Sequence, residues 1–125
     1  MKSSTKIISI ILIMAAVVMI FYSSRTPAEL GIYDDFAKCI TNSGAKMYGA
    51  YWCPHCITQK KLFGSSFQYI AYVECDPRGD GANPQACEDA GIQGYPTWIF
   101  GDGTSKSGEV PLRTLSAITG CALPE

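Results

Sequence analysis

The feature that most constrains this chain is an apolar run near its N-terminus. Residues 7–22 read IISIILIMAAVVMIFY, with one serine as the only polar interruption and with Lys2 and Lys6 before it. As a helix, such a run spans about 24 Å, slightly less than the roughly 30 Å hydrocarbon core of a bilayer. The chain therefore divides into an N-terminal segment, residues 1–25, and one domain, residues 26–125, of a size typical for a compact α/β or α+β fold.

We expect residues 1–25 to be an uncleaved signal-anchor, a transmembrane segment. A cleaved signal is the first alternative, but its apolar core is usually about 7–15 residues long and small residues precede the cut. Cuts after Ser23 or Ser24 place an aromatic residue at −3, whereas Thr26 with Ala28 is distant from the run. A buried core helix is the second alternative. In both exported cases the domain lies on the non-cytoplasmic side: periplasmic, lumenal or extracellular.

Charge excludes one class of partner. Residues 26–125 contain seven Lys and Arg against eleven Asp and Glu, a net charge of −4. The domain therefore has no basic stripe for nucleic acid. The acidic pairs Asp34–Asp35 and Glu88–Asp89 provide no convergent metal-ligand set, and we expect them on solvated helix faces. An acidic domain behind a short basic N-terminus is typical of a protein held at a membrane.

The periodicity of apolar residues predicts alternating helices and strands in residues 26–125. Helices are expected over 28–43, 55–63, 85–90 and 111–119, and strands over 45–52, 67–74, 97–100 and 104–110. A loop is expected over 76–84, and the Gly-Asp-Gly of 101–103 predicts a hairpin turn. The expected order is α-β-α-β-α-β-β-α.

The motif Cys53-Pro54-His55-Cys56 stands at the predicted junction of a strand and a helix. Unpaired N–H groups and the helix dipole would stabilise a thiolate on Cys53 at the helix N-terminus. Cys56, one turn later, could attack a mixed disulfide formed at Cys53. We therefore expect Cys53 to be the nucleophile and Cys56 the resolving thiol, with Pro54 fixing the geometry between them.

His55 lies between the two cysteines and is the chain's only histidine. A partly positive imidazole would favour the thiolate over the disulfide and make the pair a better oxidant; an ordinary surface histidine is the alternative. Haem attachment would need histidine where Ile57 stands. A zinc site, which would need two closely spaced cysteine pairs, and a purely structural Cys53–Cys56 disulfide remain as alternatives, and we expect no metal.

A second motif, Gly94-Tyr95-Pro96-Thr97, directly precedes a predicted strand. Proline in this setting is a candidate for a cis peptide bond, with a trans turn as the alternative. A cis-proline loop beside the dithiol would exclude metal and present the backbone of Tyr95 to a substrate chain. We expect Tyr95 and Trp52, which adjoin Pro96 and Cys53, to contact the substrate.

Through WCPHC, GIQGYPTW and the order of elements, residues 28–120 resemble the thioredoxin superfamily. AKMYGAYWCPHC, YVECDP and CEDAGIQGYPTW are similar, more narrowly, to the thioredoxin-like domain fused to vitamin K epoxide reductase homologues in bacteria and plants. The resemblance implies a thioredoxin-like α/β fold, a central mixed β-sheet flanked by helices, with a cis Pro96. It also implies the roles of Cys53 and Cys56 and a quinone-linked membrane partner that reoxidises the dithiol. We expect no bound cofactor.

The chain departs from this pattern in two ways. It has no vitamin K epoxide reductase helices, so we expect the partner to be a separate chain. Many thioredoxin-fold proteins hold a buried carboxylate six residues before the first cysteine, where this chain has Met47. Such a carboxylate would accept the proton of the resolving thiol. With Met47 at this position, the motif assigns no proton acceptor for the resolving thiol, and Glu74 is a candidate.

The remaining cysteines differ in what they predict. Cys75 and Cys87 flank the predicted loop, and a disulfide between them would contribute roughly 2–3 kcal/mol. We expect this structural pair, in keeping with the narrower resemblance; an electron-relaying pair or free thiols are the alternatives. Cys39 lies on the first predicted helix and Cys121 follows the last, and these helices usually cover opposite faces of a thioredoxin sheet. We therefore expect them to stay unpaired, free or with one reaching a partner chain, and a Cys39–Cys121 disulfide is the alternative.

Together these features predict a membrane-tethered thiol–disulfide oxidoreductase. We expect it to exchange disulfides with exported proteins through the Cys53–Cys56 dithiol, donating oxidising equivalents. One alternative reverses the electron flow, in a reductase or isomerase that serves cytochrome or copper-site assembly. Another is a metal-binding module that uses the fold without turnover.

Overall fold

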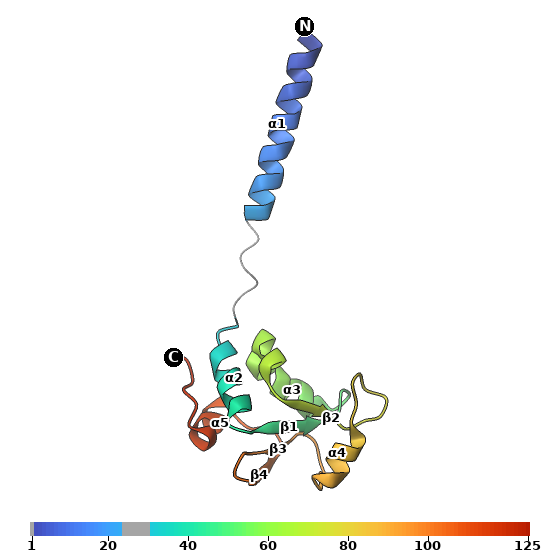
Figure 1. The fold of residues 1–125 in the computed structure, drawn as a ribbon, viewed down its shortest axis with the longest axis vertical. Coiled ribbons are helices and arrows are strands. Elements are labelled where there is room, and N and C mark those ends of the chain that lie inside the picture. The colour runs from blue at the N-terminus through green and yellow to red at the C-terminus, as the bar shows by residue number, and fades with distance from the viewer. Residues whose placement is uncertain (1, 24–30) are drawn as a thin grey trace.

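The computed structural model describes residues 2–23 and 31–125 (Figure 1). The apolar run forms helix α1 (Lys2–Ser23). Its segment Thr5–Tyr22 has a mean hydropathy of 2.4, and none of it is buried in the structure. The helix is thus long and apolar enough to cross a membrane, a property that signal sequences share. The predicted boundary between residues 25 and 26 and the predicted helix start at residue 28 lie outside the described residues.

Within residues 31–125, four short strands form one mixed sheet in the order β2-β1-β3-β4. They are β1 (Lys46–Gly49), β2 (Tyr72–Glu74), β3 (Thr97–Ile99) and β4 (Ser105–Ser107). β1 and β2 are parallel, whereas β1 with β3 and β3 with β4 are antiparallel. Tyr48 in β1 pairs with Val73 on one side and with Thr97 on the other. β1 is therefore a central strand, and the chain leaves it toward the dithiol.

Helices pack on both faces of this sheet (Figure 1). They are α2 (Asp34–Asn42), α3 (Pro54–Phe63), the 3-10 helix η1 (Gly64–Tyr69), α4 (Pro84–Asp89) and α5 (Leu112–Thr119). Successive side chains of a strand point to opposite faces, so Met47 enters the main core and Tyr48 a smaller cluster. The main core collects buried side chains from α2, α3, α5 and β3. The smaller cluster joins Tyr48 to Cys75 and to Cys87 of α4.

Several predicted elements are shorter than expected. α2 begins at Asp34, β1 stops at Gly49, and β4 covers only Ser105–Ser107. The strand predicted over 67–74 is wrong in its first half, because Gly64–Tyr69 forms η1. Phe67 packs from η1 on Phe63, with ring centroids 6.1 Å apart. The aromatic residues of η1 pack against the core, and a helical turn can bring them there as well as a strand can.

The expectation that Cys39 and Cys121 stay unpaired is wrong. They form a disulfide, with their Cα atoms 5.8 Å apart. The reason is that α2 and α5 contribute to the same core: Phe36 and Leu115 are both fully buried in it, together with Trp98. Cys39 lies within α2, and Cys121 comes shortly after the end of α5. The two helices therefore do not lie on opposite faces of the sheet.

The predicted Cys75–Cys87 disulfide is confirmed, with its Cα atoms also 5.8 Å apart. Cys75 follows β2 directly, and Cys87 lies in α4, so the bond fastens α4 to the edge of the sheet. Both cysteines are buried. This arrangement leaves Cys53 and Cys56 as the free thiols among the described residues.

Candidate active site

Cys53 stands at the N-terminus of α3, where the sequence predicts it. After β1 the chain turns through residues 50–52, and the Cys53 N–H donates to the carbonyl of Ala50 at 3.1 Å. Cys53 is the N-cap residue, and Pro54 occupies the first turn of the helix. The Ile57 N–H donates to the Cys53 carbonyl at 3.0 Å, which closes that turn. The helix thus begins at the cysteine itself, which places the residue at the positive end of the helix dipole, although its side chain makes no cap hydrogen bond.

Cys56 is fully buried beneath Cys53, which is 6% exposed. Burial, with a smaller contribution from a hydrogen bond with Cys53, raises the pKa of the Cys56 thiol to about 12, although the Ala50 backbone and Lys60 act in the opposite direction. At neutral pH Cys56 is therefore a protonated thiol. The accessible sulfur is the first one, and the second can react only after it has lost a proton.

The predicted cis peptide bond is confirmed between Tyr95 and Pro96. This loop lies against the dithiol: the Cys53 thiol donates to the Tyr95 carbonyl, with the two atoms 3.6 Å apart. The loop is held by Thr97, whose hydroxyl donates to the Gly94 carbonyl at 2.8 Å. The structure thus brings together two motifs that are 42 positions apart in the sequence.

Trp52, which directly precedes Cys53, is half-exposed. Its ring lies edge-on to that of Tyr95, with centroids 6.3 Å apart, and its Nε1 donates to the Asp76 carboxylate at 2.7 Å. Arg78 forms an ion pair with the same carboxylate. Hydrogen bonds from Arg78 and then from Trp52 hold the pKa of Asp76 well below its usual range. Asp76 was not predicted as a site residue, although it directly follows Cys75 in the YVECDP motif.

His55 is largely exposed, and its partner was not predicted. The imidazole Nδ1 lies 2.7 Å from a carboxylate oxygen of Glu109. One turn further along α3, the buried Gln59 holds this segment, since its amide accepts from the Val110 N–H at 2.6 Å and donates to the Val110 carbonyl at 3.0 Å. No local sequence signal links residues so far apart. A buried glutamine one turn after His55 is the only hint that α3 carries a polar contact.

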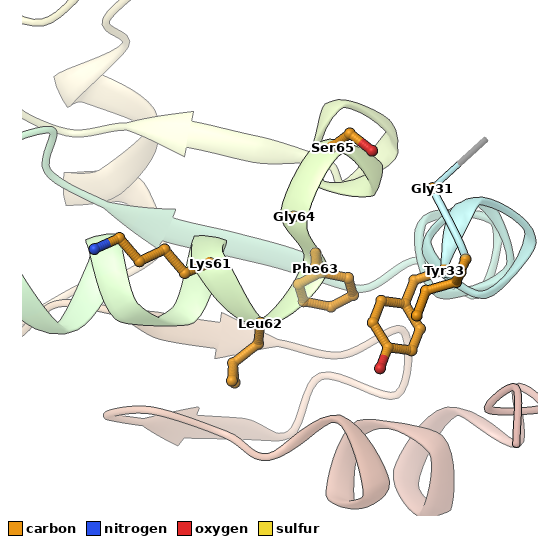
Figure 2. A pocket seen from close by; sticks show the side chains of 8 residues that line it. Gly31, Tyr33, Lys61, Leu62, Phe63, Gly64 and Ser65 are labelled. Carbon is orange, nitrogen blue, oxygen red and sulfur yellow. The ribbon is translucent and has the colours of Figure 1, made fainter. Parts of the chain in front are cut away.

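Two surface pockets, each of about 410 Å³, lie along α3. The first is lined by residues 31–33 and 61–65; Figure 2 shows Tyr33 and Phe63 facing one another there, with Lys61 and Leu62 pointing away. It is at the far end of α3 from the dithiol and contains no cysteine, histidine or carboxylate. The second is lined by Tyr51, Ile57 and Phe67 with Lys60, Lys61 and Gly64, so two of its residues are close in sequence to the dithiol but neither cysteine lines it. In the described ranges, no cluster of three or more His, Cys, Asp or Glu side chains is arranged to hold a metal ion.

The mixed sheet, the dithiol at the start of α3 and the cis-proline loop against it define a thioredoxin-like domain. The chain is 42% identical over 107 residues to the thiol-disulfide oxidoreductase LTO1 of Arabidopsis thaliana. That match covers 82% of this chain and 27% of the relative, so the chain spans about a quarter of the relative's length. No model of a known protein family matches the chain.

Solved thioredoxins superpose loosely on the structure. Chloroplastic thioredoxin z is 20% identical, with a TM-score of 0.47, over 61% of this chain and 74% of its own. The thioredoxin Mala s 13 of Malassezia sympodialis is 21% identical, with a TM-score of 0.45, over 74% and 87%. Thioredoxin O2 of Arabidopsis thaliana is 18% identical, with a TM-score of 0.40, over 69% and 81%. The fold assignment therefore rests on topology and on the position of the dithiol.

Proposed function

We propose that the protein is a thiol–disulfide oxidoreductase whose redox centre is the Cys53–Cys56 dithiol. The observation that carries the proposal is the placement of Cys53: it caps α3, contacts the Tyr95 carbonyl and covers a buried thiol. A nucleophile at a helix N-terminus, a resolving thiol one turn away and an adjacent extended backbone are what disulfide exchange requires. The similarity to a relative named as a thiol-disulfide oxidoreductase supports it.

In the oxidising direction the protein begins as the Cys53–Cys56 disulfide. A substrate thiolate attacks Cys53 Sγ, the bond to Cys56 breaks, and Cys56 leaves as a thiolate that takes up a proton. A second substrate thiolate then attacks the substrate sulfur of the mixed disulfide, and Cys53 leaves. Two electrons pass from substrate to dithiol, and the substrate gains a disulfide. We expect Trp52 and the Tyr95 backbone to contact the substrate chain, because the rings of the two residues lie together and the Tyr95 carbonyl accepts from Cys53.

We further propose that α1 tethers the domain to a membrane on the non-cytoplasmic side, and that a quinone-linked membrane oxidoreductase reoxidises the dithiol. The apolar α1 and two disulfides, which persist in oxidising compartments, support this setting. Replacing Ala16 with Arg should release protein from carbonate-washed membranes, because an arginine at a helix centre costs about 2.5–3.5 kcal/mol of insertion free energy. Unchanged retention of this variant would contradict the tether.

The full chain in detergent, oxidised at Cys53–Cys56, provides the test of the exchange reaction. Mixed with reduced, unfolded ribonuclease A, it should transfer disulfides that alkylation and mass spectrometry detect, and Cys53→Ala should abolish the transfer. Absence of transfer by the oxidised wild-type chain would refute the donor role. Stoichiometric zinc or copper in the purified protein would favour the metal-binding alternative instead.

The direction of electron flow follows from the reduction potential, measured against glutathione. A value of roughly −120 to −180 mV would place the dithiol among oxidants. A value near about −270 mV would favour the reductase or isomerase alternative.

A further inference from the structure

The buried resolving thiol needs a proton acceptor. As long as Cys56 is protonated it cannot resolve a mixed disulfide on Cys53, and when it leaves as a thiolate it must regain a proton. Met47, six residues before Cys53, is fully buried and cannot exchange a proton. Some other group near Cys56 must therefore perform this step if the proposed exchange function holds.

Gly49, the last residue of β1, lies directly beside Cys56. A Cβ atom on Gly49 would stand 2.8 Å from Cys56 Sγ and 3.3 Å from the hydroxyl oxygen of Tyr72. Both atoms thus border the space that the missing side chain leaves open. Because β1 and β2 are parallel neighbours, with Met47 paired to Tyr72 and Gly49 to Glu74, the Tyr72 ring reaches across toward this point.

Tyr72 connects this space to a buried carboxylate. Its hydroxyl donates to Glu74 Oε2 at 2.8 Å, and residues two apart on a strand point to the same face. Glu74 is only 5% exposed. Its other oxygen accepts from the Asp76 N–H at 3.0 Å, and Gly79 leaves room for it, since a Cβ there would collide with Glu74 Cγ. The carboxylate is therefore fixed in place with one oxygen directed at Tyr72.

We propose that Tyr72 and Glu74 form the proton relay of the resolving cysteine. As Cys56 becomes a thiolate, its proton passes to the Tyr72 oxygen while the Tyr72 hydroxyl proton passes to Glu74. The Cys56 thiolate then attacks Cys53 Sγ, and the substrate leaves as a thiolate. In the oxidising direction the same steps run backward, and protonated Glu74 supplies the proton for the departing Cys56. Tyr72 and Glu74 act through Cys56 and are positioning residues for the sulfur chemistry.

The surrounding charges fit this role. Burial, and then the bond to Glu74, raise the pKa of Tyr72, which keeps the phenol neutral as a relay requires. Lys60 of α3 places its ammonium 3.8 Å from the centre of the Tyr72 ring and favours the Cys56 thiolate. From the loop after β2, Asp76 contacts Glu74 through its backbone, and its own carboxylate is neutralised by Arg78. Cys53 is the remaining titratable group that faces Cys56.

The test separates attack by Cys53 from resolution by Cys56. The reduced full chain in detergent is mixed with 4,4′-dithiodipyridine in a stopped-flow instrument. Attack by Cys53 releases one thiopyridone, and resolution by Cys56 releases a second in a first-order phase. Tyr72→Phe keeps the ring under Lys60 but removes the hydroxyl, and Glu74→Gln keeps the size of the side chain but removes its charge. Tyr69→Phe, a phenol in η1, is the matched control.

We expect each variant to slow the second phase by about a hundredfold at pH 7, as removal of a positioned acid–base group does, and to leave the first phase unchanged. The deficit should shrink as the pH rises toward 10, because hydroxide then removes the proton. The double variant should be no slower than either single variant, since the two groups act as one relay. Circular dichroism confirms that each variant is folded.

Three results would overturn the relay while leaving the exchange function intact. The first is a second phase that is as fast in Tyr72→Phe and Glu74→Gln as in the wild-type protein at pH 7. The second is an equal slowing of both phases in these variants. The third is the same slowing of the second phase in Tyr69→Phe. Release of a single thiopyridone by the wild-type protein would instead refute the proposed exchange function itself.

Discussion

The imidazole Nδ1 of His55 lies 2.7 Å from Oε1 of Glu109, and this contact joins the middle of the redox motif to the segment that precedes α5. The carboxylate is 36% exposed and the imidazole 71% exposed, so solvent screens the pair. The contact nevertheless places the negative charge of Glu109 beside His55, the residue that we expect to stabilise the Cys53 thiolate. Glu109 thus opposes His55 in setting the balance between dithiol and disulfide.

Replacing Glu109 with Gln should raise the reduction potential of Cys53–Cys56, because a negative charge near the thiolate is lost. His55→Gln should lower it, because the imidazole that we expect to favour the Cys53 thiolate is lost. Each shift should be about 10–20 mV, the equivalent of an exposed charge interaction. Equilibration with glutathione measures both, and Glu88→Gln on α4 is the control. Shifts of the same sign in the two variants would contradict this opposition.

Trp52 should contribute to binding of protein substrates and not to sulfur chemistry. Asp76 fixes its ring beside Cys53, where half of the side chain stays exposed. Trp52→Ala should raise KM for a reduced protein substrate about tenfold, as loss of an aromatic anchor at an interface does. Its reaction with 4,4′-dithiodipyridine should not change. Ile32→Ala, an exposed apolar residue far along the chain, should alter neither, and an unchanged KM in Trp52→Ala would exclude Trp52 from the interface.

Alkylation should distinguish the two thiols of the reduced dithiol. Because burial raises the pKa of Cys56 to about 12, only about one molecule in ten thousand holds it as a thiolate at pH 8. Iodoacetamide should therefore modify Cys53 alone at that pH. Cys56 should begin to react as the pH rises toward 12, about tenfold faster per pH unit. Mass spectrometry of digested protein reads both sites, and double alkylation at pH 8 would contradict the burial argument.

The two disulfides should contribute unequally to stability. The Cys39–Cys121 bond closes a loop with a sequence separation of 82, against 12 for Cys75–Cys87. On the chain-entropy account the longer loop contributes about 4.5 kcal/mol and the shorter one about 2.8 kcal/mol. Replacing each pair with alanines and following tryptophan fluorescence on heating should show the larger fall in Tm for Cys39 and Cys121. The reverse order would show that chain entropy does not dominate here.

Local patterns predicted the parts of the site that lie within short stretches of chain. The CxxC spacing placed Cys53 at a helix start, and Gly64 ended that helix as expected. The element order was also predictable, because each helix and strand has its own periodicity. Strand lengths were not, since the aromatic residues of η1 pack against the core, partly buried, as strand residues do.

Contacts between distant segments escaped the sequence analysis. Nothing in the vicinity of Glu109 points to His55, and the Cys39–Cys121 bond depends on α2 and α5 sharing one core. Tyr72 was within reach of prediction: it stands two residues before Glu74 on a strand, hence on the same face. What the sequence lacked was the register with β1, which brings that face to Gly49 and Cys56.

The Cys39–Cys121 bond also determines how the domain bears a mechanical load. A pull between residue 31, on the side of α1, and residue 125 travels along α2 to Cys39 and crosses directly to Cys121 through sulfur. The segment between them, which holds all four strands of the described domain and the dithiol, is bypassed by the force. Short strands with few hydrogen bonds would be the first part of such a fold to give way under tension. Here the Cys39–Cys121 disulfide carries the force past the strands, so tension along the chain leaves the redox centre folded.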